Sequence, residues 1–217
     1  MLREITKHYP PRLWKLESPY ATLIHTILSQ NTTDGNSDRA MQELRKHYHI
    51  TPTNLAKAKT TKIMQIIRPA GLYRSKANHI KAVSGIIERE YRGKLTTILR
   101  LNYRTAKEKL TSLPGVGPKT ADIILAFNAG YQVIPVDTHV SRIAKRLGIA
   151  PADANYETIR SRLESLTLPS QRRDLHLSMI QFGRTICKAR KPLCGVCPIN
   201  LSCPSSNANI TTVNNSF

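Results

Sequence analysis

The chain has 217 residues, 40% of them hydrophobic, a globular composition that suits one large domain or two small ones. Its apolar stretches, such as residues 123–127, are too short to cross a bilayer, and residues 1–5 lack the apolar core of a secretory signal, so we expect an intracellular protein with no membrane partner. Lys and Arg number 33 against 14 acidic residues, and the net charge of +19 favours nucleic acid as the partner over a merely solvated or membrane-facing basic surface.

Apolar residues recur with a helical period along nearly the whole chain, and no strand–helix alternation appears, so the sequence predicts an all-α fold. Ser18-Pro19 and Thr51-Pro52 each pair an N-cap residue with proline at the first helical position. The expected helices run from Pro19 through Leu28 and over residues 34–47, 63–67 (ended by Gly71), 77–87, 103–113, 118–129, 137–147, 156–166 and 170–182. The Asn/Ser/Thr-rich segment 205–217 is expected to be a disordered tail.

Residues 113–121 join two of these helices through the turn Gly115-Val116-Gly117. Glycine allows the backbone to turn sharply and to approach another backbone closely. The helix that begins at Pro118 would present free N–H groups and its positive dipole end at the turn, which makes an anion site suited to a DNA phosphate. An ordinary helix connection is the alternative, since such turns often contain glycine. With Leu-Pro before it and Lys-Thr-Ala after it, the motif resembles the helix-hairpin-helix of DNA repair proteins.

A second motif, Val136-Asp137-Thr138-His139-Val140, stands at the start of the next expected helix. Asp137 is a good N-cap residue, and helix N–H bonds favour the charged form of a carboxylate. Asp137 is therefore expected to be a poor proton acceptor but a durable negative charge. For His139 we favour a structural or phosphate-contacting role over catalysis.

All four cysteines lie near the C-terminus, with the spacing Cys187-x6-Cys194-x2-Cys197-x5-Cys203. Disulfides are unexpected in a cytosolic protein, so the clustering indicates a metal or iron–sulfur site. Four thiolates can bind zinc or an iron–sulfur cluster, and the spacing alone leaves both open. Basic residues in and beside the first loop would present positive charge to phosphates: Arg184, Lys188, Arg190 and Lys191.

Over roughly residues 15–204, the chain resembles the endonuclease III family of the helix-hairpin-helix DNA glycosylase superfamily. The resemblance rests on residues 28–34, 71–77, 113–121 and 136–142 and on the four cysteines. The cysteine spacing is that of the family's [4Fe-4S] cluster, so the resemblance favours this cofactor over zinc. It also implies two helical lobes: a six-helix barrel of residues 20–131 that contains the hairpin, and an iron–sulfur cluster domain of residues 1–19 and 132–204.

By the family pattern, Lys119 would be the nucleophile, Asp137 the essential carboxylate and Leu72 a wedge in the DNA stack. A lysine with an ordinary pKa is protonated at neutral pH and cannot attack, but the helix N-terminus and the basic surroundings of Lys119 should lower its pKa. Where the family often has glutamine to fill the gap left by a flipped nucleotide, this chain has Asn31, with Gln30 one place earlier, and either could fill it. The expected DNA contacts are Gly115, Val116, Gly117, Gln30, Asn31, Leu72, His139, Lys188, Arg190 and Lys191.

The resemblance implies a monomeric, prokaryotic-type enzyme of the cytoplasm and nucleoid. It would remove damaged bases, chiefly oxidised pyrimidines, from double-stranded DNA and would cleave abasic sites by β-elimination through a lysine Schiff base. One alternative is a mismatch-specific glycosylase for adenine or thymine, but such relatives commonly lack lysine at the position of Lys119, and the adenine-specific ones tend to carry a further domain. A second alternative is a non-catalytic DNA-binding module, against which the pairing of Lys119 with Asp137 argues, because phosphate binding does not need the aspartate.

Overall fold

The computed structural model describes residues 1–11 and 17–206. Within this part of the chain there are twelve α-helices, a few short 3-10 helices and no β-strand, which confirms the expected all-α fold. The chain divides into two compact units. Residues 15–131 form one, which we call the hairpin unit, and residues 1–14 with 132–217 form the other, which we call the cysteine unit.

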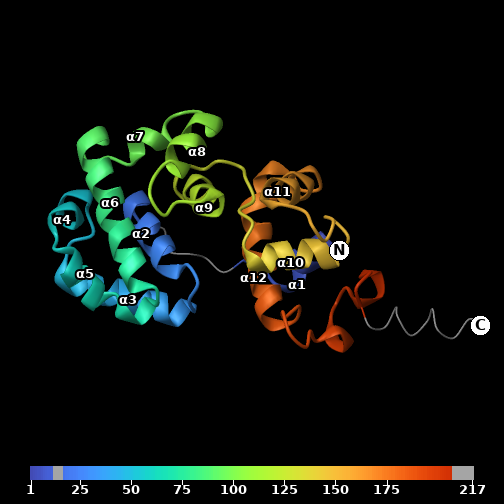
Figure 1. Ribbon diagram of the computed structural model, residues 1–217. Helices are drawn as coiled ribbons and strands as arrows, with labels where there is room; N and C mark the ends of the chain where they lie inside the picture. The colour runs from blue at the N-terminus through green and yellow to red at the C-terminus, as the bar shows by residue number, and fades with distance from the viewer. Residues whose placement is uncertain (12–16, 207–217) are drawn as a thin grey trace, which may run out of the picture. The chain divides into compact units, whose positions relative to one another are not determined.

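Eight α-helices make up the hairpin unit (Figure 1). They are α2 (Pro19–Ser29), α3 (Asp34–His47), α4 (Pro52–Lys57), α5 (Thr60–Ile66), α6 (Tyr73–Tyr91), α7 (Thr96–Leu99), α8 (Tyr103–Thr111) and α9 (Pro118–Asn128). The long helix α6 packs against α2, α4 and α5, and its stripe of Ala77, Ile80, Val83 and Ile87 is fully buried in their shared core. This stripe follows the helical period seen in the sequence, so the apolar pattern is what places α6 at the centre of the unit.

The helix starts expected from the sequence are present in the hairpin unit. The Ser18 hydroxyl accepts a hydrogen bond from the Ala21 amide, with Pro19 at the first helical position. The Thr51 hydroxyl accepts from the Asn54 amide in the same way, ahead of Pro52. These N-caps satisfy amides that have no partner inside the helix, and they confirm both predicted starts.

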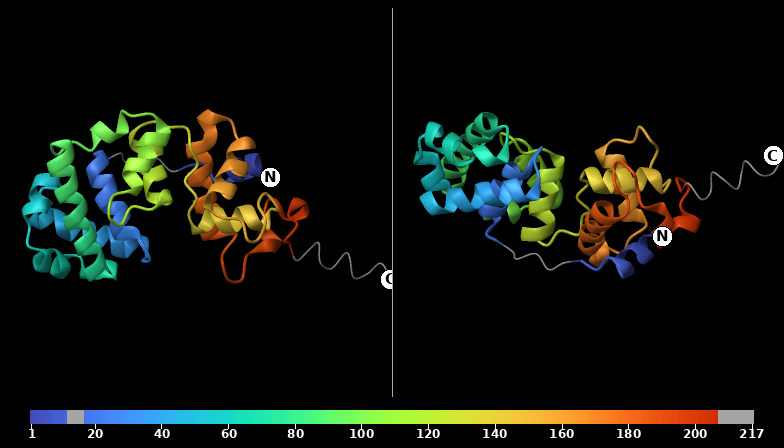
Figure 2. Two further views of the ribbon diagram at one scale, coloured as in Figure 1. Left: turned by 45° about the horizontal axis from the view of Figure 1, so that its top comes forward. Right: turned by 90° about the horizontal axis from the view of Figure 1, so that it is seen from below.

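Four α-helices make up the cysteine unit: α1 (Leu2–His8), α10 (Thr138–Arg146), α11 (Tyr156–Ser165) and α12 (Arg172–Thr185). The N-terminal helix α1 lies along α12, as both views in Figure 2 show. Ile5 of α1 is fully buried in the same core as Ile143, Leu163 and Met179. Between α12 and residue 206, where the described part ends, the chain forms only the short 3-10 helices Cys194–Val196 and Asn200–Ser202.

Two helices of the structure, α1 and α7, were not expected from the sequence. Each is short, and α1 buries one residue in its core, so neither carries the repeated apolar stripe that a periodicity argument needs. Among the residues expected in a disordered tail, Ser205 and Ser206 are described, and Ser206 is buried; residues 207–217 lie outside the described part. No helix in the described residues is long and apolar enough to cross a membrane.

Candidate functional site

The hairpin expected at residues 113–121 joins α8 to α9 in the structure. Gly115 has a φ of +77°, a conformation that L-residues rarely adopt, and a Cβ there would lie 2.7 Å from the His79 ring. Gly117 is the N-cap of α9, with a φ of −90° and no atom within 4 Å of the place that a Cβ would take. The first glycine is thus required by the fold, whereas the second leaves an open approach to the N-terminus of α9.

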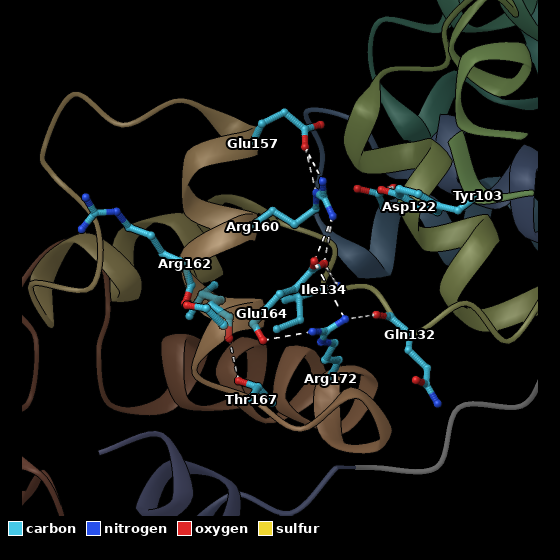
Figure 3. A network of polar contacts seen from close by, with 12 residues as sticks. Tyr103, Asp122, Gln132, Ile134, Glu157, Arg160, Arg162, Glu164, Thr167 and Arg172 are labelled. Atoms are coloured by element: carbon cyan, nitrogen blue, oxygen red, sulfur yellow. Dashed lines mark hydrogen bonds and ion pairs between the residues drawn. The ribbon is translucent and has the colours of Figure 1, made fainter. Parts of the chain in front are cut away.

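A buried polar contact holds the two hairpin helices together. Asp122 of α9 has no exposed surface, and its two carboxylate oxygens accept hydrogen bonds from the Tyr103 hydroxyl at 2.9 Å and the Lys107 ammonium at 3.0 Å, both on α8. Figure 3 draws the Tyr103–Asp122 pair. A buried carboxylate is stable only when it is paired and hydrogen-bonded, so this contact fixes the relative placement of α8 and α9.

Gln30 contacts the hairpin from the end of α2. Its side-chain amide donates to the Gly115 carbonyl at 2.9 Å and lies 3.5 Å from the Thr120 hydroxyl. Asn31, the next residue, is exposed and has a φ of +51°. Of the two residues that could fill a gap in the DNA, Gln30 therefore braces the hairpin, while Asn31 lies at the surface of the turn.

Lys119 is the second residue of α9 and follows the hairpin directly, with its side chain partly buried. Leu72 lies in another turn of the same unit, between the 3-10 helix Arg68–Ala70 and α6, and is 60% exposed with a φ of +45°. A leucine that packed under the turn as core would be covered. The exposure of Leu72 excludes that reading and leaves its side chain available to another molecule.

Lys76, which was not named as a site residue from the sequence, connects the end of α2 with the turn that precedes α6. It is 2% exposed, and its ammonium donates to the Leu28 carbonyl at 2.7 Å and the Ala70 carbonyl at 2.8 Å. Burial lowers the pKa of Lys76. The sequence signal was weak, because a single lysine on an amphipathic helix is normally solvated.

In the cysteine unit, Asp137 is the N-cap of α10, as expected. Its Oδ1 accepts a hydrogen bond from the Val140 amide at 2.7 Å, and its carbonyl accepts from the Ser141 amide at 2.9 Å. The side chain is partly exposed. Lys119 and Asp137 belong to different units, so the structure describes each within its own surroundings.

His139 lies against α12 in the cysteine unit. A Cβ on Gly183 would stand 2.8 Å from His139 Nδ1, so the glycine permits this close packing. Burial lowers the pKa of His139, and the nearby charges of Arg142 and Arg184 act in the same direction, while Asp137 opposes them. His139 is thus packed within the cysteine unit, and its structural or phosphate-contacting role stays a prediction.

The four cysteines line one cavity of about 220 Å³ in the cysteine unit, together with apolar side chains such as Phe182 and Ile199. Burial raises the pKa values of Cys197 and Cys203, and the neighbouring thiols raise them further. Four thiolates can therefore share this space only when a cation compensates their charge. A [4Fe-4S] cluster takes four thiolates, one on each iron, so the four cysteines of this cavity fit that cofactor.

Two arginines of α10 hold the first cysteine loop, and both were missed from the sequence. Arg142 donates from Nε and Nη2 to the Cys187 carbonyl at 3.1 and 2.9 Å. Arg146 donates to Cys187 Sγ at 3.3 Å and to the carbonyls of Lys188 and Ala189 at 2.7 and 3.0 Å. The sequence signal for this pair was their spacing of four residues, which places both arginines on one face of a helix. The loop's basic side chains are exposed: Lys188, Arg190 and Lys191.

Comparison with known proteins gives two family matches. Residues 24–169 match the model of the HhH-GPD superfamily base excision DNA repair proteins, and residues 187–203 match that of the iron–sulfur binding domain of endonuclease III. Endonuclease III of Thermotoga maritima is 38% identical over 94% of this chain and 90% of that protein. Endonuclease III of Escherichia coli K12 is 32% identical over 93% of this chain and 90% of that protein.

Solved structures agree with these matches. A trapped endonuclease III–DNA covalent intermediate superposes with a TM-score of 0.86 at 30% identity, covering 96% of this chain and 95% of that one. A thermostable thymine-DNA glycosylase has a TM-score of 0.78 at 22% identity, covering 94% of each chain, which shows a shared fold alone. The chain therefore belongs to the endonuclease III family, and it is a base-excision repair DNA glycosylase with abasic-site lyase activity that carries a [4Fe-4S] cluster.

Proposed function

We propose that this glycosylase and lyase removes damaged bases, chiefly oxidised pyrimidines, from duplex DNA with Lys119 as its nucleophile and Asp137 as an electrostatic partner. The observation that carries the proposal is the position of Lys119, in the first turn of α9 directly after the open hairpin glycine Gly117. The similarity to an endonuclease III trapped covalently on DNA supports it, because a covalent intermediate requires a nucleophile from the protein.

A damaged base inside a duplex can be reached only after its nucleotide is flipped out of the stack. We assign Leu72 as the wedge, because an exposed leucine held in a left-handed turn offers an apolar surface to the DNA stack. We assign Asn31 as the residue that fills the vacated position, because Gln30 already uses its amide on the Gly115 carbonyl.

The hairpin would bind a phosphate of the DNA backbone. The amides at the start of α9 have no partner inside the helix, and the positive end of the helix dipole favours an anion there. Gly117 leaves this end open. The exposed Lys188, Arg190 and Lys191 would add phosphate contacts from the first cysteine loop, and His139 is retained as a further candidate contact.

In the chemical step, the unprotonated amine of Lys119 forms a bond to the sugar carbon C1′ as the bond to the base breaks. The base leaves with that electron pair and takes up a proton. Opening of the sugar ring then gives a Schiff base, and loss of a proton from C2′ expels the 3′ phosphate by β-elimination. Hydrolysis of the Schiff base returns the lysine.

Asp137 acts by charge in this proposal. Positive charge develops on the sugar while the base departs, and an ionised carboxylate stabilises it. The hydrogen bond from the Val140 amide to Asp137 Oδ1 holds the carboxylate in place.

The [4Fe-4S] cluster, when bound, supplies a structural crosslink for residues 187–203 rather than a step of the reaction. We assign Cys187, Cys194, Cys197 and Cys203 as its ligands, because their thiols line one cavity. We also assign residues 20–131 to the barrel domain and residues 1–19 with 132–204 to the cluster domain. The two compact units support this division, but the hairpin unit has eight α-helices rather than the expected six, and it also includes residues 17–19. The enzyme would act as a monomer on lesion-containing or abasic DNA in the nucleoid.

The test is borohydride trapping on a duplex that contains an oxidised pyrimidine. Wild type should give a covalent protein–DNA adduct, whereas Lys119→Gln should give none while still binding the duplex. Asp137→Asn should bind normally and turn over far more slowly. Adduct formation by Lys119→Gln at the wild-type level would show that another amine is the nucleophile.

A further inference from the structure

We propose that Glu164 is a positioning residue for Asp137, and that it acts through the backbone of residues 132–136. This segment, which we call the approach segment, leads directly into the N-cap of α10 and lies within the cysteine unit. The proposal rests on the role for Asp137 proposed above. Glu164 bonds to Ile134, Arg160 and Arg172, all within the cysteine unit, so we expect its effect to reach the reaction through Asp137.

The approach segment is extended and buried. Its residues belong to no helix or strand, yet Val133, Ile134 and Val136 are each at most 6% exposed. Buried amides and carbonyls must find hydrogen-bond partners, and an extended segment cannot supply them to itself. Here, side chains of neighbouring helices supply these hydrogen-bond partners.

Glu164 and Arg172 hold the first part of the segment, as Figure 3 shows. Glu164 Oε1, on α11, accepts a hydrogen bond from the Ile134 amide at 3.0 Å. Arg172 Nη1, on α12, donates to the Gln132 carbonyl at 2.6 Å, and Nη2 donates to the Glu164 carbonyl at 3.0 Å. The segment is therefore tied to both helices near its start.

Two further side chains hold the second part. His176 Nδ1 lies 2.8 Å from the Pro135 carbonyl, and the His176 side chain is buried. The Tyr156 hydroxyl accepts a hydrogen bond from the Val136 amide at 3.3 Å. Together with Glu164 and Arg172, these groups fix the backbone up to the residue before Asp137.

The Glu164 carboxylate is itself held in a charged network. It is 14% exposed and pairs with the Arg160 guanidinium through two hydrogen bonds of 3.0 and 3.1 Å, while Arg172 lies 4.0 Å away. Two nearby guanidinium groups hold the carboxylate in one orientation. A fixed anion is a strong acceptor for the Ile134 amide, so Glu164 determines where the approach segment lies.

A shift of the approach segment would move the Asp137 carboxylate. Asp137 follows Val136 directly and has only a short side chain, so the position of the backbone determines the position of its carboxylate oxygens. The stabilisation that a carboxylate gives to positive charge on the sugar depends on the distance between the two. A misplacement of about 1 Å can lower a rate by about 100-fold. Loss of the Glu164 contact should therefore appear in the chemical step rather than in DNA binding.

The experiment measures single-turnover base excision, duplex affinity and thermal stability of the cluster-loaded protein. Glu164→Ala should slow excision by about 10- to 100-fold and leave the Kd for DNA within about twofold of wild type. Glu164→Gln keeps an oxygen acceptor for the Ile134 amide and should recover most of the rate. Glu157→Gln is the matched control, because Glu157 also pairs with Arg160 on α11 but is 52% exposed.

A double-mutant cycle with Asp137→Asn separates this inference from the proposed function. If Glu164 acts through Asp137, then Glu164→Ala should slow Asp137→Asn by no more than about twofold, because the charge that it positions is already gone. An equal loss in both backgrounds would overturn the inference. A wild-type excision rate for Glu164→Ala, with a slow rate for Asp137→Asn, would also overturn the inference. Wild-type rates for Asp137→Asn itself would overturn the proposed function instead.

Should Glu164→Ala fail to fold, Arg172→Gln tests the same segment from its other anchor, the Gln132 carbonyl. A slower excision rate with unchanged DNA affinity is again expected. A folded Arg172→Gln protein with the wild-type rate would then overturn the inference.

Discussion

The two units use different means to present their functional groups. In the hairpin unit, a continuous apolar core surrounds α6. Buried polar contacts such as Asp122–Lys107 hold neighbouring helices together. In the cysteine unit, residues 186–206 have only short 3-10 helices; arginine side chains hold the first cysteine loop, and the four thiols line one cavity. Packed helices and their side chains hold the glycine turn, including the Gln30 amide on the Gly115 carbonyl, whereas we expect the loop with little core to depend on its cofactor.

The largest effect is expected when the cluster ligands are changed. Cys197→Ala should reduce iron from about four atoms per chain towards none, because the remaining three thiols leave one iron without its ligand. Thermal unfolding of the cysteine unit should then occur at a lower temperature, since cluster binding contributes to folding. Iron and sulfide analysis with a melting curve provides the measurement. Ser202→Ala in the same loop is the control, and full cluster loading of Cys197→Ala would contradict the ligand assignment.

The next largest effect concerns the brace inside the hairpin unit. Asp122→Ala leaves the Lys107 ammonium, which is 14% exposed, without its carboxylate and should lower the free energy of unfolding by about 3–5 kcal/mol. Glu108→Ala is the matched control, because its ion pair with Arg104 is largely exposed and should matter by less than about 1 kcal/mol. Urea unfolding measures both. Similar losses for the two variants would mean that Asp122 does not brace α8 and α9.

Substitutions of the two hairpin glycines should have different effects, one on stability and the other on DNA affinity. Gly115→Ala must adopt a φ of +77° and contact the His79 ring, so the free energy of unfolding should fall by at least about 1–2 kcal/mol. Gly117→Ala meets no neighbour and should change stability by less than about 0.5 kcal/mol, while weakening duplex binding at every salt concentration. Unchanged affinity of Gly117→Ala would show that the N-terminus of α9 does not contact DNA.

The smallest effect on stability is expected at Leu72. Leu72→Ala removes a side chain that is 60% exposed, so stability should change by less than about 0.5 kcal/mol. Excision of base-paired lesions should nevertheless slow more than cleavage of pre-formed abasic sites, because only the former need the stack to be opened. Leu168→Ala, at 61% exposure in the cysteine unit, is the control. A stability loss of about 2 kcal/mol or more at Leu72 would indicate a packing role instead.

Most of the helices, two of their N-caps and the hairpin could be predicted from local patterns in the sequence. Ser18 and Thr51 were identifiable as caps because an N-cap bond joins residues only three apart. The apolar stripe of α6 was visible for the same reason, since its residues recur every three or four positions. The glycines of the hairpin and the cysteine spacing are also local patterns, and they led to the family and its cofactor.

The polar side chains that hold these elements in place could be identified only from the packed structure. Gln30 meets the Gly115 carbonyl, 85 positions away in the chain, and Lys76 meets the Leu28 carbonyl, 48 positions away. Glu164 reaches the Ile134 amide from a different helix. Such contacts depend on how whole helices pack, and a charged residue on a helix has the same local pattern whether it is solvated or buried. Their free energy comes from burial and from paired partners, which no short stretch of sequence contains.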